Sequence, residues 1–176
     1  RTALVVCPVN VIENWAKELH KWSATGSAQI QFFVFSDCAK NAVKRAQLLE
    51  VWHNGGGVMI MSYDQFRNLA NCKAKPETKE KILAALIEPG PAFVICDEGH
   101  IMKNPASAIS KAMSRLATRR RLVLTGTPMQ NNLNEYHCII DYVRPGRLGS
   151  RGAFTRKIVD VIETGGKVDA SEEERQ

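Results

Sequence analysis

Five short apolar runs recur along the chain and are separated by longer, amphipathic stretches. The runs are rich in β-branched and other apolar residues and lie at residues 3–8, 30–35, 57–62, 92–97 and 121–126. Their apolarity is continuous rather than alternating, which is typical of strands with both faces covered in a parallel sheet. We therefore predict five buried β-strands.

The stretches between these runs have the periodicity of helices. Within residues 10–22, apolar side chains recur at intervals of three or four, at Ile12, Trp15, Leu19 and Trp22. This spacing predicts an amphipathic helix that buries both tryptophans. Further helices are predicted at residues 40–53, 63–71, 76–88, 105–117 and 132–143, the fourth of these five beginning with Pro105 in its first turn. Alternating strands and helices indicate an α/β fold with a largely parallel sheet flanked by helices.

Composition narrows the classes of protein. A chain of 176 residues suits one domain, and no apolar run approaches the ~20 residues that cross a bilayer. The beginning of the chain lacks the pattern of a cleavable signal peptide, so we expect an intracellular protein. The five cysteines lack metal-ligand spacing, which indicates reduced thiols. Cys138 follows His137, but neighbouring helical side chains point about 100° apart, which argues against a metal or nucleophile pair.

The charge is unevenly distributed. The net charge is +6, but residues 169–176 hold four acids and one base, so the rest of the chain carries +9. Residues 103–121 hold six bases and no acid. Such a basic body favours a polyanionic partner, nucleic acid first. For the helix predicted within this stretch, a basic face that is simply solvated is the simpler interpretation.

Polar chemistry follows two of the predicted strands. Asp97 ends the apolar run at 92–97, with Glu98 and His100 just after it, and Thr125 and Gly126 end the run at 121–126, with Thr127 next. Ligands of parallel sheets bind at the carboxyl ends of strands. An aspartate there could hold Mg²⁺, directly or through water, and the adjacent glutamate could activate a water that attacks a nucleotide phosphate. The simpler alternative is a strand that stops at a polar turn.

Four motifs that follow one another along the chain decide between a nucleotide site and a simple polar turn. They are "LVVCPVNVIENWAKELHKW", "GVMIMSYDQF", "DEGHIMKN" and "LTGTPMQNNLNEYH". They resemble motifs Ia, Ib, II and III of the superfamily 2 helicases, and in particular the Swi/Snf-type chromatin-remodelling ATPases. The resemblance implies a RecA-like, three-layer fold of the P-loop NTPase type. Gly99, where most of these motors have alanine, points to one subgroup of the remodellers.

The sequence also departs from that pattern. It contains no GxxxxGK[ST] loop, whose backbone and lysine would hold nucleotide phosphates, and it lacks motifs IV to VI. We therefore expect a fragment, with residues 1–163 forming an incomplete N-terminal RecA-like lobe and residues 164–176 an acidic, disordered tail. The isolated fragment is expected to be inactive, whereas the full-length protein would hydrolyse ATP.

The resemblance implies a role for each matching residue. Asp97 would coordinate the Mg²⁺ of Mg-ATP, and Glu98 would activate the attacking water. His100 would relay the state of the nucleotide to Thr125, Gly126, Thr127 and Gln130. For His100 a purely structural role in the turn remains the alternative, as helix capping does for Gln130.

The same resemblance implies a path for DNA. Motif Ia and Ib loops run along the phosphate backbone in this family, and Pro8, Asn10, Ser62 and Tyr63 occupy those loops here. Lys103 begins the basic stretch and is a further candidate. The implied function is that of a nuclear, DNA-stimulated ATPase that translocates on duplex DNA and remodels nucleosomes, with histones and a histone chaperone as partners of the subgroup. A catalytically inactive nucleic-acid-binding module with an ATPase-like fold is the alternative, and a cysteine or metal hydrolase is a third.

Overall fold

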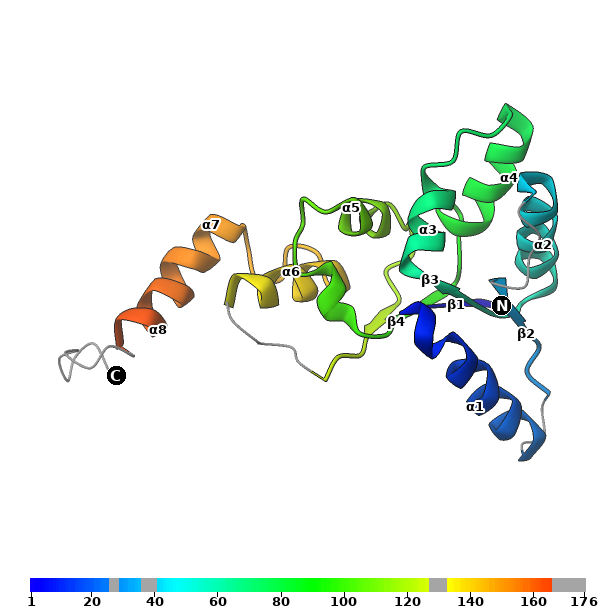
Figure 1. The fold of residues 1–176 in the computed structure, drawn as a ribbon. Coiled ribbons are helices and arrows are strands. Elements are labelled where there is room, and N and C mark those ends of the chain that lie inside the picture. Colours follow the sequence, from blue (N-terminus) through cyan, green and yellow to red (C-terminus); the bar gives the residue numbers. More distant parts are fainter. Residues whose placement is uncertain (26–28, 36–40, 127–132, 166–176) are drawn as a thin grey trace.

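The computed structural model describes residues 1–25, 29–35, 41–126 and 133–165. Five parallel strands form one sheet in the order β2-β3-β1-β4-β5 (Figure 1). The strands are β1 (Thr2–Cys7), β2 (Phe32–Val34), β3 (Gly57–Ser62), β4 (Phe93–Cys96) and β5 (Arg121–Val123). All five coincide with the predicted apolar runs, so the prediction of a parallel α/β sheet is confirmed.

The register aligns the carboxyl ends of the strands. Cys7 of β1 lies opposite Ser62 of β3, and Val6 lies opposite Cys96 of β4, which in turn pairs with Val123 of β5. The segments that leave β1, β3, β4 and β5 therefore emerge side by side at one edge of the sheet. Every motif singled out in the sequence has residues at this edge.

Helices cover the two faces of the sheet unequally (Figure 1). On one face, α1 (Ile12–Thr25) follows a short 3-10 turn, η1 (Val9–Val11), and packs on Val5 and Ile60. The other face carries the larger core, which lies beneath several helices and includes the fully buried Trp52 and Phe66. These helices are α2 (Ala42–Gly55), α3 (Tyr63–Ala70), α4 (Pro76–Leu86), α5 (Ala108–Ser114) and α6 (Leu133–Val143).

The chain continues beyond α6 in a helical segment that the sequence patterns did not predict. It consists of α7 (Arg151–Phe154), the π-helical turn η4 (Thr155–Val159) and α8 (Asp160–Gly165), and it extends away from the sheet (Figure 1). The domain boundary predicted after residue 163 falls within α8. Among the described helices, none is long and apolar enough to span a membrane.

Two local predictions were wrong. The helix predicted from Pro105 begins only at Ala108, because Ser107 caps it by accepting a hydrogen bond from the Ser110 amide at 3.1 Å. Trp22 was expected in the core but is 66% exposed. The apolar periodicity continues past the part of α1 that packs on the sheet, and the Trp22 indole instead donates to Glu18 at 3.0 Å.

Candidate active site at the carboxyl edge of the sheet

Asp97 is held by hydrogen bonds from three directions. Its Oδ1 accepts from the Glu98 amide at 2.9 Å, and its Oδ2 accepts from Nε1 of Trp15 at 2.8 Å. The Tyr63 hydroxyl donates to its backbone carbonyl, also at 2.8 Å. The orientation of the carboxylate is therefore set by α1 and by the amide of the turn, while α3 holds the backbone of the same residue.

Strand alternation explains why Asp97 meets α1. Successive side chains of a strand point to opposite faces, and Val94 and Cys96 lie in the larger core. Ile95 packs with the α1 cluster, and Asp97, two residues on, points to the same face.

Glu98 has an unusual backbone conformation. Its φ of 51° and ψ of 50° are left-handed, a conformation that costs a non-glycine residue about 1 to 3 kcal/mol and that is enriched at functional sites. Its carboxylate lies 3.2 Å from Nδ1 of His100, and its side chain is 42% exposed. Glu98 therefore presents an accessible carboxylate beside the anchored one of Asp97.

The end of β5 packs against this acidic turn. Nδ1 of His100 also lies 3.4 Å from the Thr125 hydroxyl, and the Gly99 amide donates to the Leu124 carbonyl at 2.9 Å. A Cβ at Gly99 would overlap Cγ1 of Val123, so this position requires glycine as long as valine stands opposite. The structure thus joins His100 to Thr125, and Gly126 is exposed at the same strand end. Thr127 and Gln130, predicted to continue this connection, lie outside the described residues.

The donor set at this edge fits a partly protein-bound Mg²⁺. Mg²⁺ prefers oxygen ligands and usually takes one or two carboxylates, with phosphate and water oxygens completing its shell. Asp97 supplies one such carboxylate, and each of its oxygens keeps a lone pair beyond its single hydrogen bond. Within the described residues, no group of three or more His, Cys, Asp or Glu could hold a metal ion alone. The site therefore suits a metal carried by a nucleotide, and not a self-contained metal centre.

Uncharged groups lie beneath the acidic pair. Burial raises the pKa of both the Cys7 and the Cys96 thiol to about 12, and the nearby Asp97 carboxylate contributes to the shift at Cys7. Burial also raises the pKa of Tyr63 far above its usual value, with Cys96 and Asp97 adding to the effect. The thiols and the phenol therefore stay neutral at physiological pH.

The residues predicted to face DNA differ in their accessibility. Asn10 is exposed and Pro8 half-buried, in the segment that joins β1 to α1. Ser62 and Tyr63 are buried, and their polar groups already have partners. Ser62 and Gln65 form a capping box at the start of α3, and the Tyr63 hydroxyl holds Asp97.

The basic residues of the stretch at 103–121 have different surroundings in the fold. Lys103 forms an ion pair with Glu135 of α6 at 3.3 Å. Arg115 donates to the Ala70 carbonyl, and Arg121 donates to the carbonyls of Leu116, Thr118 and Tyr142. Arg119 and Arg120 are exposed but precede β5, and so lie at the edge of the sheet opposite Asp97.

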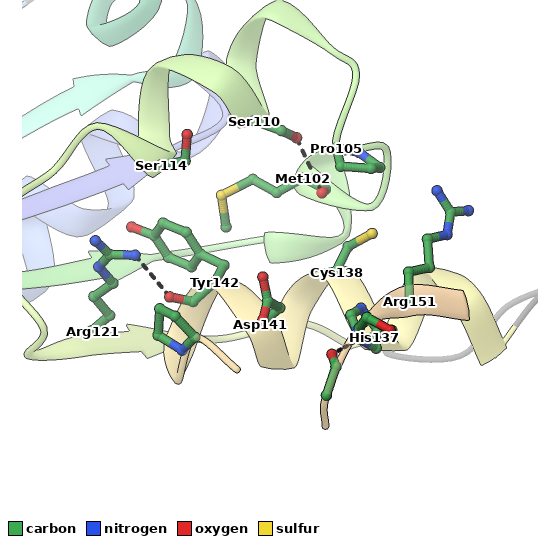
Figure 2. Close-up of a pocket in the computed structure, with 13 residues that line it drawn as sticks. Met102, Pro105, Ser110, Ser114, Arg121, His137, Cys138, Asp141, Tyr142 and Arg151 are labelled. Carbon is green, nitrogen blue, oxygen red and sulfur yellow. Dashed lines mark hydrogen bonds between the residues drawn. The ribbon is translucent and has the colours of Figure 1, made fainter. Parts of the chain in front are cut away.

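A cavity of about 650 Å³ lies apart from the acidic turn, between α5, α6 and the start of α7 (Figure 2). Its wall includes the ring of Tyr142, on which the Arg121 guanidinium stacks at 4.6 Å from the ring centre. His137 and Cys138 also line it, but His137 Nε2 bonds to the Gly149 carbonyl at 3.0 Å. These contacts are structural and give no support to the hydrolase alternative.

Sequence patterns missed the role of Trp15. Its spacing predicted a core residue, and it does pack against the cluster under α1, but its indole N–H also reaches Asp97. One signal was available, because a half-buried indole N–H usually needs an acceptor. Finding that acceptor required knowing which face of β4 α1 covers.

Comparison with known proteins gives one consistent result. The family model described as SNF2-related domain matches residues 1–175. Human "Transcriptional regulator ATRX" is 45% identical over 175 residues, which cover 97% of this chain and 7% of that protein. Mouse "Helicase ARIP4" is 34% identical over 209 residues, covering 97% of this chain and 14% of that protein.

A solved structure agrees with these sequence matches. The SWI2/SNF2 ATPase core of Sulfolobus solfataricus in complex with dsDNA matches with a TM-score of 0.65 and 26% identity, covering 98% of this chain and 31% of that one. The predicted Swi/Snf resemblance, its subgroup around ATRX and the RecA-like fold class are thereby confirmed. The chain spans less than a third of the solved core and a small fraction of the named relatives.

Proposed function

This chain belongs to the SNF2-related family, and from that membership we propose that it works within a DNA-stimulated ATPase that translocates along duplex DNA and remodels nucleosomes. The observation that carries the proposal is the pair of carboxylates at the carboxyl edge of the sheet. The carboxylate of Asp97 is anchored by Trp15 of α1 and by the Glu98 amide, and that of Glu98 is accessible beside it.

The two carboxylates have different roles in hydrolysis. Asp97 binds the Mg²⁺ of Mg-ATP, directly or through water, and the ion when bound neutralises charge on the phosphates. Glu98 orients and deprotonates the attacking water. Its carboxylate lies 3.2 Å from Nδ1 of His100, and this contact limits its freedom.

His100 connects this pair to motif III. Because Nδ1 of His100 is within reach of both Glu98 and the Thr125 hydroxyl, a change at the glutamate alters the hydrogen bond to the end of β5. Thr125 and Gly126 pass that change on, together with Thr127 and Gln130 in the segment that follows.

DNA lies along the same edge, over the segments that follow β1 and β3. Pro8 and Asn10 are the accessible residues there, while Ser62 and Tyr63 shape the turn from below. Contacts to phosphates fix register without reading bases, which suits movement along any sequence. Lys103, next to the acidic turn, adds positive charge when its pairing with Glu135 loosens.

The relatives support a nuclear role. Their names include a transcriptional regulator and a helicase, and the solved core is bound to duplex DNA. We place this protein in the nucleus, acting on nucleosomes, with histones and a histone chaperone as partners.

A catalytically inactive nucleic-acid-binding module is the second candidate. It is favoured by one observation, the lack of a GxxxxGK[ST] loop in these residues. Under the ATPase proposal the isolated chain binds ATP too weakly to detect, because the phosphate cradle must come from residues outside it. Clear micromolar affinity of the isolated chain for ATP would contradict this.

A charge introduced at Asn10 tests the DNA path. Asn10→Asp places a negative charge at the proposed phosphate contact, and Asn54→Asp makes the same change at an exposed position at the opposite edge. The affinity of the isolated chain for duplex DNA should fall several-fold for Asn10→Asp and stay near wild type for Asn54→Asp. Binding should also weaken with salt, since phosphate contacts release counterions. Equal effects of the two variants, or no effect of salt, would refute this path.

A further inference from the structure

Trp15 makes a contact that packing does not require. It lies on the face of α1 that covers the sheet, half-buried against the cluster that includes Val5, Cys7 and Ile60. A phenylalanine would fill much of the same apolar space. Only an indole carries the N–H that reaches Oδ2 of Asp97, 82 residues away in sequence, at 2.8 Å.

The three tryptophans of the chain provide an internal comparison. Each indole N–H has an acceptor: Trp52 donates to the Gly57 carbonyl at 3.1 Å, and Trp22 donates to Glu18 at 3.0 Å. Trp22 is exposed and bonds a carboxylate of its own helix, one turn away. Of the three, only Trp15 joins its helix to a residue of the acidic turn.

We propose that Trp15 is a positioning residue that holds the Asp97 carboxylate in the orientation that binds Mg²⁺. This inference rests on the metal role proposed above for Asp97. With Oδ1 bonded to the Glu98 amide and Oδ2 to Trp15, rotation of the carboxylate would break a hydrogen bond at each oxygen. The remaining lone pairs therefore point in fixed directions before the metal arrives.

Partners that hydrogen-bond a metal-binding carboxylate change metal affinity by about 10 to 100-fold when they are removed. Trp15 is also tied to the proposed DNA path, because α1 starts two residues after the exposed Asn10. A shift of the segment that follows β1 would therefore move the group that orients Asp97.

The contact itself is measurable in the 176-residue chain. In a ¹H–¹⁵N spectrum the three indole N–H groups give separate signals. Asp97→Asn should shift the Trp15 signal and speed its exchange with water, while the Trp22 signal stays in place. An unchanged Trp15 signal would overturn the proposal even if Trp15 variants fold poorly.

The positioning role is tested by metal affinity in the intact ATPase. Mn²⁺ replaces Mg²⁺ as the probe, and free Mn²⁺ is measured by electron paramagnetic resonance in the presence of a non-hydrolysable ATP analogue. Trp15→Phe should raise the dissociation constant for Mn²⁺ about tenfold. Trp22→Phe, the matched control on the same helix, should leave it unchanged.

A double variant separates positioning from packing. If Trp15 acts through Asp97, then adding Trp15→Phe to Asp97→Asn weakens Mn²⁺ binding no further. No effect of Trp15→Phe alone, or an equal loss in both backgrounds, would overturn the inference while leaving Asp97 as a metal ligand. If Asp97→Asn itself left Mn²⁺ binding unchanged, the metal role of Asp97 would fail, and the inference with it.

Discussion

Asp97 has partners at both carboxylate oxygens and at its carbonyl, whereas Glu98 beside it keeps an exposed carboxylate. This difference suits two roles, one acid held still for a metal and the other free to meet water. The thiols and the phenol below the turn are uncharged, because burial raises their pKa values. The negative charge at this point therefore comes from the two carboxylates.

The buried thiols lead to a prediction at this scale. Cys7 and Cys96 are fully buried, with pKa values near 12, so neither is accessible or ionised at pH 8. Iodoacetamide at pH 8 should leave both unmodified in the folded chain and alkylate both in urea, as mass spectrometry would show. Rapid labelling of Cys96 in the folded chain would contradict the burial described.

The same pKa values set the direction of a pH effect. Unfolded thiols ionise near pH 9 and the folded ones only near pH 12, so the unfolded state loses protons first. The free energy of unfolding should hold below pH 9 and fall as the pH rises from 9 to 12. Urea titrations at pH 8 and pH 10.5 would measure the difference, and Cys96→Ala should reduce it.

At the scale of elements, the contact between β5 and η3 (Gly99–Met102) depends on the lack of a side chain at Gly99. Gly99→Ala should lower the free energy of unfolding by about 1 to 3 kcal/mol, because the added methyl group overlaps Val123. Val123→Ala in the same chain should recover part of this loss. Chemical denaturation of the two single variants and the double variant gives the coupling between these residues. A double variant that loses the sum of the single effects would show that the two side chains do not meet.

Patterns in the sequence predict helices and strands better than they predict the contacts between those elements. The apolar runs identified all five strands of the described sheet, because parallel strands buried on two faces are almost continuously apolar. The periodicity of α1 placed Trp15 and Trp22 on one face, but could not show that the sheet ends between them, or that Trp15 faces Asp97. The helical segment after residue 150 was missed because Gly152 and a polar run interrupt its pattern.

In the candidate site, too, some residues could be predicted from local sequence, and others depend on contacts between elements. Asp97 and Glu98 were predicted from their place after a strand and from the family motif, since both signals are local. The capping role of Ser62 and the contact from Tyr63 to Asp97 depend on how α3 leaves β3, which spacing along the chain does not reveal. Arg121 is a similar case, because its position in a basic run does not reveal the three backbone carbonyls to which it donates in the fold.

At the scale of the whole molecule, one edge of the sheet gathers the chemistry. The segment after β1 leads to Trp15 and the segment after β3 leads to Tyr63, and both residues contact Asp97. A change in either segment therefore reaches the acidic turn through one helix. In the function we propose, this arrangement lets DNA bound along the edge influence hydrolysis.

The most direct test is the DNA-stimulated rate of ATP hydrolysis in the intact ATPase with Glu98→Gln. This variant keeps the shape of residue 98 but removes the carboxylate that we propose activates water, so the rate should fall by at least about a hundredfold while ATP and duplex DNA still bind. Glu77→Gln, at an exposed glutamate of α4, should hydrolyse ATP at the wild-type rate. Undiminished hydrolysis by Glu98→Gln would contradict the assignment of the acidic turn as the site of hydrolysis.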